Sequence, residues 1–165
     1  MNSLMRSWLW LGLLVVVALV VPSLLVDRDG PLLPGSLGTL TLQTSVVGAD
    51  AAVLVDRMHG RSVAEGENAI GVYRAARGHA VLYVTRYADA DGASEAEMRM
   101  GEKIGSGDYV FRGFRRAIVD GQPVAACSGL GQEHFILSRG PVLYWLAVDP
   151  PHAEEALRSL VVWLR

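Results

Sequence analysis

Hydrophobic residues follow three different patterns along the chain. The first is an uninterrupted apolar run at residues 8–26, which contains no charged side chain. The second is an alternation of apolar and polar positions, punctuated by glycine, which begins at residue 39 and covers most of the remaining chain. Alternation indicates half-buried β-strands. The third pattern, with apolar positions three and four residues apart, occurs in two segments and indicates helices.

The uninterrupted run at residues 8–26 predicts a membrane anchor. A helix of this length covers roughly 30 Å, the thickness of the hydrocarbon layer. Arg6 precedes the run and Asp27 follows it, so the positive-inside rule places residues 1–7 in the cytoplasm and the rest of the chain in an extracytoplasmic (periplasmic) space. The residues expected to contact the lipid bilayer begin with two indole rings at one boundary: Trp8, Trp10, Leu14, Val17, Val21 and Val26.

A cleaved signal peptide is the competing interpretation of the same run. Its apolar region would end near Val21, and Ser23 would lie close to the cleavage site. The apolar run continues past Ser23, however, and no A-x-A sequence precedes it. The uncleaved anchor is therefore the favoured prediction.

The remaining chain predicts a linker and one domain. Residues 27–38 contain two prolines and three glycines, a composition typical of a linker. Residues 39–165 are enough for a single core and form the extracytoplasmic domain. Short connecting segments that contain glycine separate the alternating runs, as in β-hairpins. The predicted strands are 39–47, 52–58, 69–75, 79–87, 109–111, 114–120, 123–130, 133–138 and 142–148.

Two segments have helical spacing. The first, residues 94–104, begins with Ser94 and Glu97 in a capping-box pattern. The second, residues 151–164, starts with a proline that suits a first turn, and acidic residues follow near its positive end. The apolar side of this second helix, expected to face the sheet, consists of Ala153, Ala156, Leu157, Leu160, Val161 and Leu164.

These elements predict an α+β fold with a large, mainly antiparallel sheet and two packed helices. The connections between strands are too short for the crossovers that parallel strands need. A faint internal repeat points the same way, since Arg77-Gly78 and Arg139-Gly140 each precede a Val-Leu-Tyr sequence and then a helix. Two such ββα units would place both helices on one face of the sheet.

Composition narrows the function classes. Against 17 acidic residues the chain has 15 Lys and Arg, a net charge of −2, and so lacks the basic footprint that nucleic acid requires. One cysteine excludes an intrachain disulfide framework and a Cys-rich zinc site.

Asp89 and Asp91 resemble part of a calcium loop, but Tyr87 and Met98 would occupy ligand positions, and an acidic turn before a helix fits better. The four histidines show no ligand spacing, so neither a metal nor a cofactor is predicted.

Cys127 and His134 are the one candidate pair for nucleophilic chemistry. A short connection joins their strands, so the two residues face each other and His134 is a possible base for a thiolate. Cys127, however, lies in a stretch of small residues typical of a buried, structural cysteine, and no G-x-S-x-G sequence is present. No catalytic residue is predicted, and a thiol or hydrolytic enzyme is the third functional hypothesis.

Two groups of residues are candidates for contacts with a partner or an anion. Arg112, Arg115 and Arg116 supply guanidinium groups that bind phosphate or carboxylate, although such charges are also typical of a protected edge strand. Trp145 and Trp163 carry large aromatic rings. In a strand at residues 142–148, Trp145 and its neighbour Tyr144 point to opposite faces of the sheet. These rings predict either burial on both sides of the sheet or an apolar surface patch.

The sequence as a whole predicts a non-enzymatic, membrane-anchored extracytoplasmic protein. Its expected role is that of an accessory subunit or assembly factor of a larger membrane protein complex, because no convergent group of polar residues is evident. An envelope binding module for a small or lipidic ligand is the alternative, and it requires a concave apolar pocket.

Overall fold

A computed structural model describes residues 30–107 and 110–165. The chain divides into two compact units, Met1–Pro31 and Leu32–Arg165, and the fold is that of the second unit. The predicted anchor at residues 8–26 lies outside the described residues. Within the part of the chain that is described, no helix is both long enough and apolar enough to cross a membrane.

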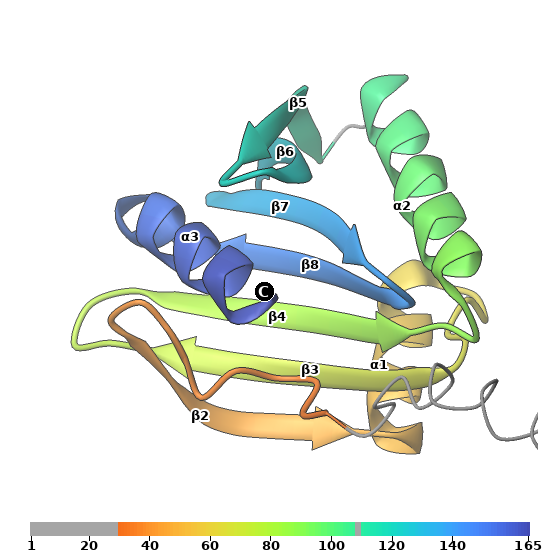
Figure 1. Cartoon of the computed structure of the whole chain (residues 1–165), viewed down its shortest axis with the longest axis horizontal. Helices are drawn as coiled ribbons and strands as arrows, with labels where there is room; N and C mark the ends of the chain where they lie inside the picture. The colour runs from red at the N-terminus through yellow and green to blue at the C-terminus, as the bar shows by residue number, and fades with distance from the viewer. Residues whose placement is uncertain (1–29, 108–109) are drawn as a thin grey trace, which may run out of the picture. The chain divides into compact units, whose positions relative to one another are not determined.

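The second unit contains one eight-stranded antiparallel sheet with the strand order β1-β2-β3-β4-β8-β7-β6-β5 (Figure 1). The strands are β1 (Ser36–Leu37), β2 (Leu40–Val47), β3 (Glu67–Arg74), β4 (His79–Arg86), β5 (Phe111–Val119), β6 (Gln122–Gly129), β7 (Gln132–Arg139) and β8 (Val142–Val148). The helices are α1 (Ala49–His59), α2 (Ala90–Gly105) and α3 (Ala153–Trp163), and a 3-10 turn at Pro150–His152 precedes α3. The α+β architecture and the antiparallel sheet predicted from the sequence are therefore confirmed.

The two faces of the sheet are covered by different helices. On one face, Leu82, Leu146 and Phe135 lie in register on neighbouring strands and belong to the larger apolar cluster, which α3 completes. We call this the α3 face. On the other face, Ile136 and Leu143 form a second cluster with α2, and α1 lies on this side as well (Figure 1). We call this the groove face.

Most of the predicted strands and the last helix are where the sequence places them. The two-residue turn at Asp120-Gly121 joins β5 to β6 as predicted. The connection from β3 to β4 contains Arg77-Gly78 but is four residues long, and the turn from β7 to β8 is Gly140-Pro141, because Arg139 still belongs to β7. The apolar side of α3 is buried as predicted, and Val162 and Trp163 lie off it. The short strand predicted at 109–111 is instead, as far as it is described, the start of β5, which runs on through a bulge at Gly113.

The strand predicted at 52–58 is wrong, because these residues belong to α1. Three alanines and Asp50 in the first turn favour a helix, and Gly60 ends it in the left-handed conformation with φ of 66°. The apolar run at residues 53–55 fits a strand as well as a helix, because short apolar runs are ambiguous. Ala51, Val55 and Met58 are four and three residues apart, a spacing that places them on one side of a helix. Of these, Ala51 is the one buried residue of α1.

The capping box predicted at Ser94 and Glu97 is also wrong. Helix α2 begins four residues earlier than Ser94, and the Asp89 side chain caps it by accepting a hydrogen bond from the Gly92 amide at 2.9 Å. The Glu97 carboxylate accepts a hydrogen bond from the Ser138 hydroxyl of β7 at 2.6 Å instead. Glu97 therefore ties α2 to the sheet rather than closing its N-terminus.

The two hairpin-and-helix units predicted from the internal repeat are present, as β3–β4–α2 and β7–β8–α3. Their helices lie on opposite faces of the sheet, however, and not on one face. The reason is visible in β8, where Leu143 is buried on the groove face while Tyr144 and Leu146 are buried on the α3 face. A strand that is apolar on both sides requires cover on both sides.

The turn between β5 and β6 depends on glycine at position 121. Asp120 and Gly121 have φ values of 50° and 83°, the two positive values of a type I′ turn, and a Cβ at Gly121 would meet no atom within 4 Å. Gly121→Ala should therefore destabilise the domain through backbone strain alone, by about 1–2 kcal/mol, seen as a lower melting temperature. Gly35→Ala is the matched control, since that position is equally open but has no positive φ; equal melting temperatures for the two variants would contradict this account.

Candidate functional site

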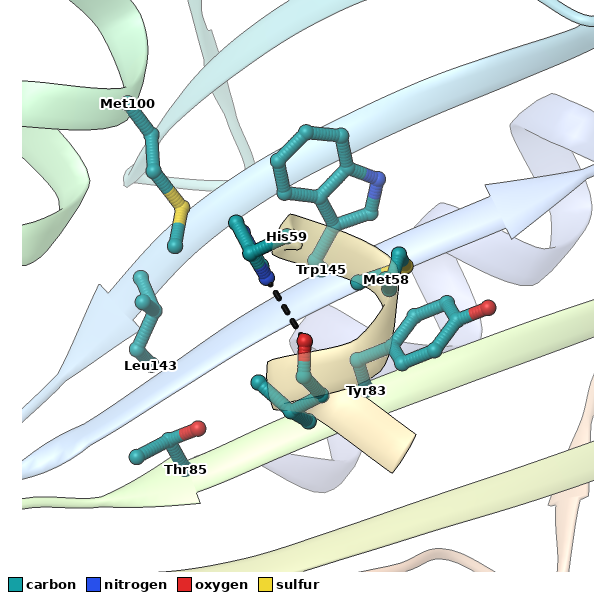
Figure 2. Close-up of a pocket in the computed structure, with 8 residues that line it drawn as sticks. Met58, His59, Tyr83, Thr85, Met100, Leu143 and Trp145 are labelled. Atoms are coloured by element: carbon teal, nitrogen blue, oxygen red, sulfur yellow. Dashed lines mark hydrogen bonds between the residues drawn. The ribbon is translucent and has the colours of Figure 1, made fainter. Parts of the chain in front are cut away.

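A shallow groove runs between α1 and α2 on the groove face (Figure 2). Strands β4 and β8 form its floor through Tyr83, Thr85, Leu143 and Trp145, and the helices form its walls. The wall residues are Val55, Met58 and His59 of α1 and Met100 of α2. We call this set of eight residues the α1–α2 groove. Its lining is mainly apolar, with only a few polar atoms.

Hydrogen bonds around the end of α1 hold that wall of the groove in place. The Asp56 carboxylate accepts hydrogen bonds from the backbone amides of Val63 and Ala64 at 2.6 and 2.7 Å. These two bonds lower the pKa of Asp56, and the Ser62 hydroxyl adds to the effect. The chain that leaves α1 is thereby folded back against the helix.

A buried asparagine connects this returning chain to the groove floor. Asn68 is almost fully buried; its amide nitrogen donates to the backbone oxygens of Glu65 and Gly66, and its oxygen accepts from the Thr85 hydroxyl at 2.9 Å. Because Thr85 lines the groove, Asn68 fixes the floor and the loop after α1 relative to each other.

Helix α2 approaches β5 closely because it carries glycine where it meets an aromatic ring. A Cβ at Gly101 would lie 3.1 Å from the Phe114 ring, and one at Gly105 would lie 3.3 Å from the same ring. Phe114 therefore seats α2 on the sheet, and the Ser138–Glu97 hydrogen bond holds it there. Both groove walls are positioned by contacts outside the groove itself.

Trp145, predicted as a candidate partner contact, lies in the groove floor and is oriented by His134 of the neighbouring strand β7, on the same face of the sheet. Its indole N–H donates to His134 Nδ1 at 3.0 Å, and His134 Nε2 lies 3.0 Å from the Gly129 carbonyl oxygen. The Phe111 ring packs edge-on against His134, with centroids 4.9 Å apart. These hydrogen bonds indicate a neutral imidazole with the proton on Nε2, because Nδ1 must accept the hydrogen bond from the indole N–H. Burial is the main cause that lowers the pKa of His134.

Cys127 and His134 face each other on β6 and β7, as the sequence predicts. Cys127 is fully buried, and both ring nitrogens of His134 are engaged with Trp145 and Gly129. A base needs a free lone pair to accept the thiol proton, and the lone pair of His134 Nδ1 already accepts a hydrogen bond from the Trp145 indole. The geometry therefore gives no support to a thiolate mechanism at this pair.

The three candidate arginines of β5 do not form one patch. Arg115 pairs with Ala126, whose neighbour in β7 is Phe135, so it belongs to the α3 face. Arg116 pairs with Ala125, whose neighbour is Ile136, so it belongs to the groove face. Arg112 pairs with Ser128, two residues from Ala126 along β6, so it lies on the α3 face with Arg115, on the other side of the bulge. The structure thus distributes the charges over the two sides of one edge strand.

Trp163, the other aromatic candidate, does not line the groove and has different surroundings. It lies on α3, is 37% exposed, and packs edge-on against Tyr144 with ring centroids 6.4 Å apart. Tyr144 is buried on the α3 face, and burial raises its pKa to about 12. The structure therefore places Trp145 and Trp163 on opposite faces of the sheet, serving different surroundings.

The groove was missed in the sequence because α1 was taken for a strand. Met58, Val55 and His59 come together only on a helix, where residues three and four apart share a side. The left-handed Gly60 after a basic last turn was the available signal for that helix.

The hollow of the groove has a volume of about 40 Å3. Sites for small molecules generally begin near ~300 Å3. Among residues 30–107 and 110–165, no three or more His, Cys, Asp or Glu side chains gather in a way that could hold a metal ion. What the groove offers is an apolar surface between two helices rather than a chamber.

Comparison of the chain with protein-family models, with curated proteins and with solved structures gives no match.

The His134 hydrogen-bond chain predicts a pH dependence. The pKa of His134 in the folded protein lies below its ordinary value of 6.5. The stabilisation from the neutral ring is therefore complete above pH 6.5 and is lost as the pH falls from there through the folded-state pKa, because the unfolded chain binds the proton first. An NMR titration of the ring nitrogens should show a neutral ring with the proton on Nε2 and a midpoint below 6.5.

Trp145→Phe is the matched variant for this titration, since it keeps an aromatic ring and removes the indole donor. Its midpoint should move up towards 6.5. A wild-type midpoint at or above 6.5, or no difference between the two proteins, would contradict the assignment of Nδ1 as the acceptor.

Proposed function

We propose that this chain is a non-catalytic, membrane-anchored accessory subunit or assembly factor, which binds a partner protein through the α1–α2 groove. The observation that carries the proposal is the exposed apolar surface beside the groove. Met58 is 55% exposed at the groove wall, and Leu54, one helical turn earlier, is also exposed. Contiguous apolar surface of this kind is typical of sites that a partner covers.

The size and lining of the groove favour a protein partner over a small ligand. A hollow of about 40 Å3 is too small to enclose a small molecule of ordinary size. Two helix walls over an apolar floor instead suit a partner's protruding apolar side chains, as in helix-in-groove recognition. Tyr83 and Thr85 of the floor and His59 of the wall contribute the polar side chains of the lining.

Aromatic and methionine side chains make the groove suitable for binding. Trp145 and Tyr83 are rigid rings of the type that dominates binding energy at interfaces. Met58 and Met100 are flexible and polarisable, and they can adjust to a partner's shape. The hydrogen bond to His134 holds the Trp145 ring ready, which lowers the entropic cost of binding.

The membrane part of the proposal depends on residues 8–26, whose uncharged run predicts an anchor with the domain outside the cytoplasm. An anchored protein is confined close to other membrane proteins. Confinement raises the effective concentration of the partner, so a groove of modest affinity suffices.

Crosslinking tests the groove directly. A photoreactive benzophenone attached to Met58→Cys in the full-length chain, in native membranes, should give one discrete protein adduct, because that position lies at the groove wall. Met98→Cys is the matched control: Met98 is 50% exposed on α2, similar to Met58, and does not line the groove. The native Cys127 is buried and should not be labelled.

Two results would count against a protein partner. Equal adducts from both positions would show that the groove is no more occupied than the rest of the surface. Adducts with lipid alone at Met58→Cys would favour the binding module for a lipidic ligand.

The anchor has a test of its own. Val17→Lys places a charge in the middle of the apolar run and costs about 2.5–3.5 kcal/mol on membrane-insertion scales. The chain should then be lost from the membrane fraction, whereas Val17→Leu should remain there. Retention of Val17→Lys in alkali-washed membranes, or a mature chain that begins near Leu24, would contradict the anchor.

A further inference from the structure

Strand β5 is an edge of the sheet within the described residues, and its second half is a regular template for another strand. After the bulge at Gly113, the five residues Arg115–Val119 pair with β6 in unbroken register. Every other backbone N–H and C=O of an edge strand points away from the sheet. The opposite edge, β1, has only two residues and offers no comparable length.

The side chains of residues 115–118, along this edge, are exposed to solvent. Ile118 is 75% exposed, and Ala117 is exposed beside it. Arg115 and Arg116 have side chains that are 57% and 59% exposed. A large branched apolar residue on an edge strand is a liability unless something covers it.

The two arginines are only loosely paired within the domain. Arg115 lies 3.9 Å from Glu133, and Arg116 lies 4.0 Å from Glu97. Charge-assisted hydrogen bonds between guanidinium and carboxylate groups are shorter, about 2.7–2.9 Å. Both carboxylates have closer partners, since Glu133 accepts from Ser128 at 2.8 Å and Glu97 accepts from Ser138 at 2.6 Å. The guanidinium groups therefore keep donors available for a ligand.

We infer that β5 binds an extended acidic segment of a partner protein, which adds to the sheet as a further strand beside Arg115–Val119. The main-chain groups of β5 supply the hydrogen bonds, as in other cases of strand addition. Two adjacent acidic residues of the partner point to opposite faces of the extended sheet, where one meets Arg115 and the other meets Arg116. An apolar residue of the partner covers Ile118. This surface is separate from the α1–α2 groove, and the inference does not require the groove to be occupied.

The distribution of charge favours this occupant over two others. A flat anionic membrane surface matches this arrangement less well than a strand does, because the two arginines project from opposite faces of β5. A second copy of β5, paired antiparallel along Arg115–Val119, would place Arg115 opposite Val119 and Arg116 opposite Ile118, and so would offer the guanidinium groups no carboxylate. An acidic strand, by contrast, presents its side chains alternately to both faces.

Binding of a synthetic peptide tests the inference. The full-length chain in nanodiscs of zwitterionic lipid is titrated with a short fluorescent peptide of valine and threonine that carries two adjacent glutamates at its centre. We expect saturable binding that weakens as salt is raised, and none for the same peptide with lysines in place of the glutamates. A peptide with N-methylated backbone amides should not bind, because it cannot join the sheet.

A double variant and a matched control separate the strand from general electrostatics. Arg115→Gln with Arg116→Gln should weaken peptide binding about tenfold. Arg74→Gln with Arg99→Gln removes the same charge from exposed positions outside β5 and should leave binding unchanged. Melting curves of both variants establish that they are folded.

Other outcomes overturn the inference. Equal binding by the N-methylated peptide would show an electrostatic contact without strand addition. Binding to vesicles of anionic phosphatidylglycerol that the Arg115→Gln, Arg116→Gln variant abolishes, without any peptide binding, would assign the edge to the membrane. Dimerisation that Ile118→Lys abolishes, again without peptide binding, would assign it to a second copy of this chain.

Discussion

The structure depends on a central pair of strands, β4 and β8, of which β8 is buried on both faces. Leu146 and Tyr144 face one side and Leu143 the other, so neither face can be left to solvent. Apolar burial on both sides is the largest favourable term available to a domain of this size. Because both faces of β8 must be covered, α3 packs on one face and α2 on the other. The groove lies between α2 and α1 on the second of these faces. The candidate binding surface is thus a consequence of how the core is closed.

How much of this was evident in the sequence differs between elements. The alternating runs and glycine turns predicted seven of the eight strands at least in part, because side-chain alternation and positive φ are local properties. Helix α1 was missed because its short apolar run at residues 53–55 also fits a strand, although Ala51, Val55 and Met58 have helical spacing. The faces on which α2 and α3 pack were also beyond a local pattern, because they depend on which side of β8 each helix must cover.

The candidate sites show the same division. Pairing of Cys127 with His134 followed from a short connection, but the role of His134 did not, because its indole partner comes from another strand. The three arginines form one patch in the sequence, whereas the pleat of β5 puts Arg116 on one face of the sheet and Arg112 and Arg115 on the other. The groove and the edge strand are the two surfaces on which the proposed contacts are based, one apolar and concave, the other charged and extended.

Helix α1 has one further consequence. With a single buried side chain, it makes few of the packing contacts that resist local opening, and the hydrogen bonds that Asp56 accepts from the following loop hold it in place instead. A partner that displaces α1 would therefore uncover little apolar surface, and the free-energy cost of adapting the groove would fall on this helix rather than on the sheet.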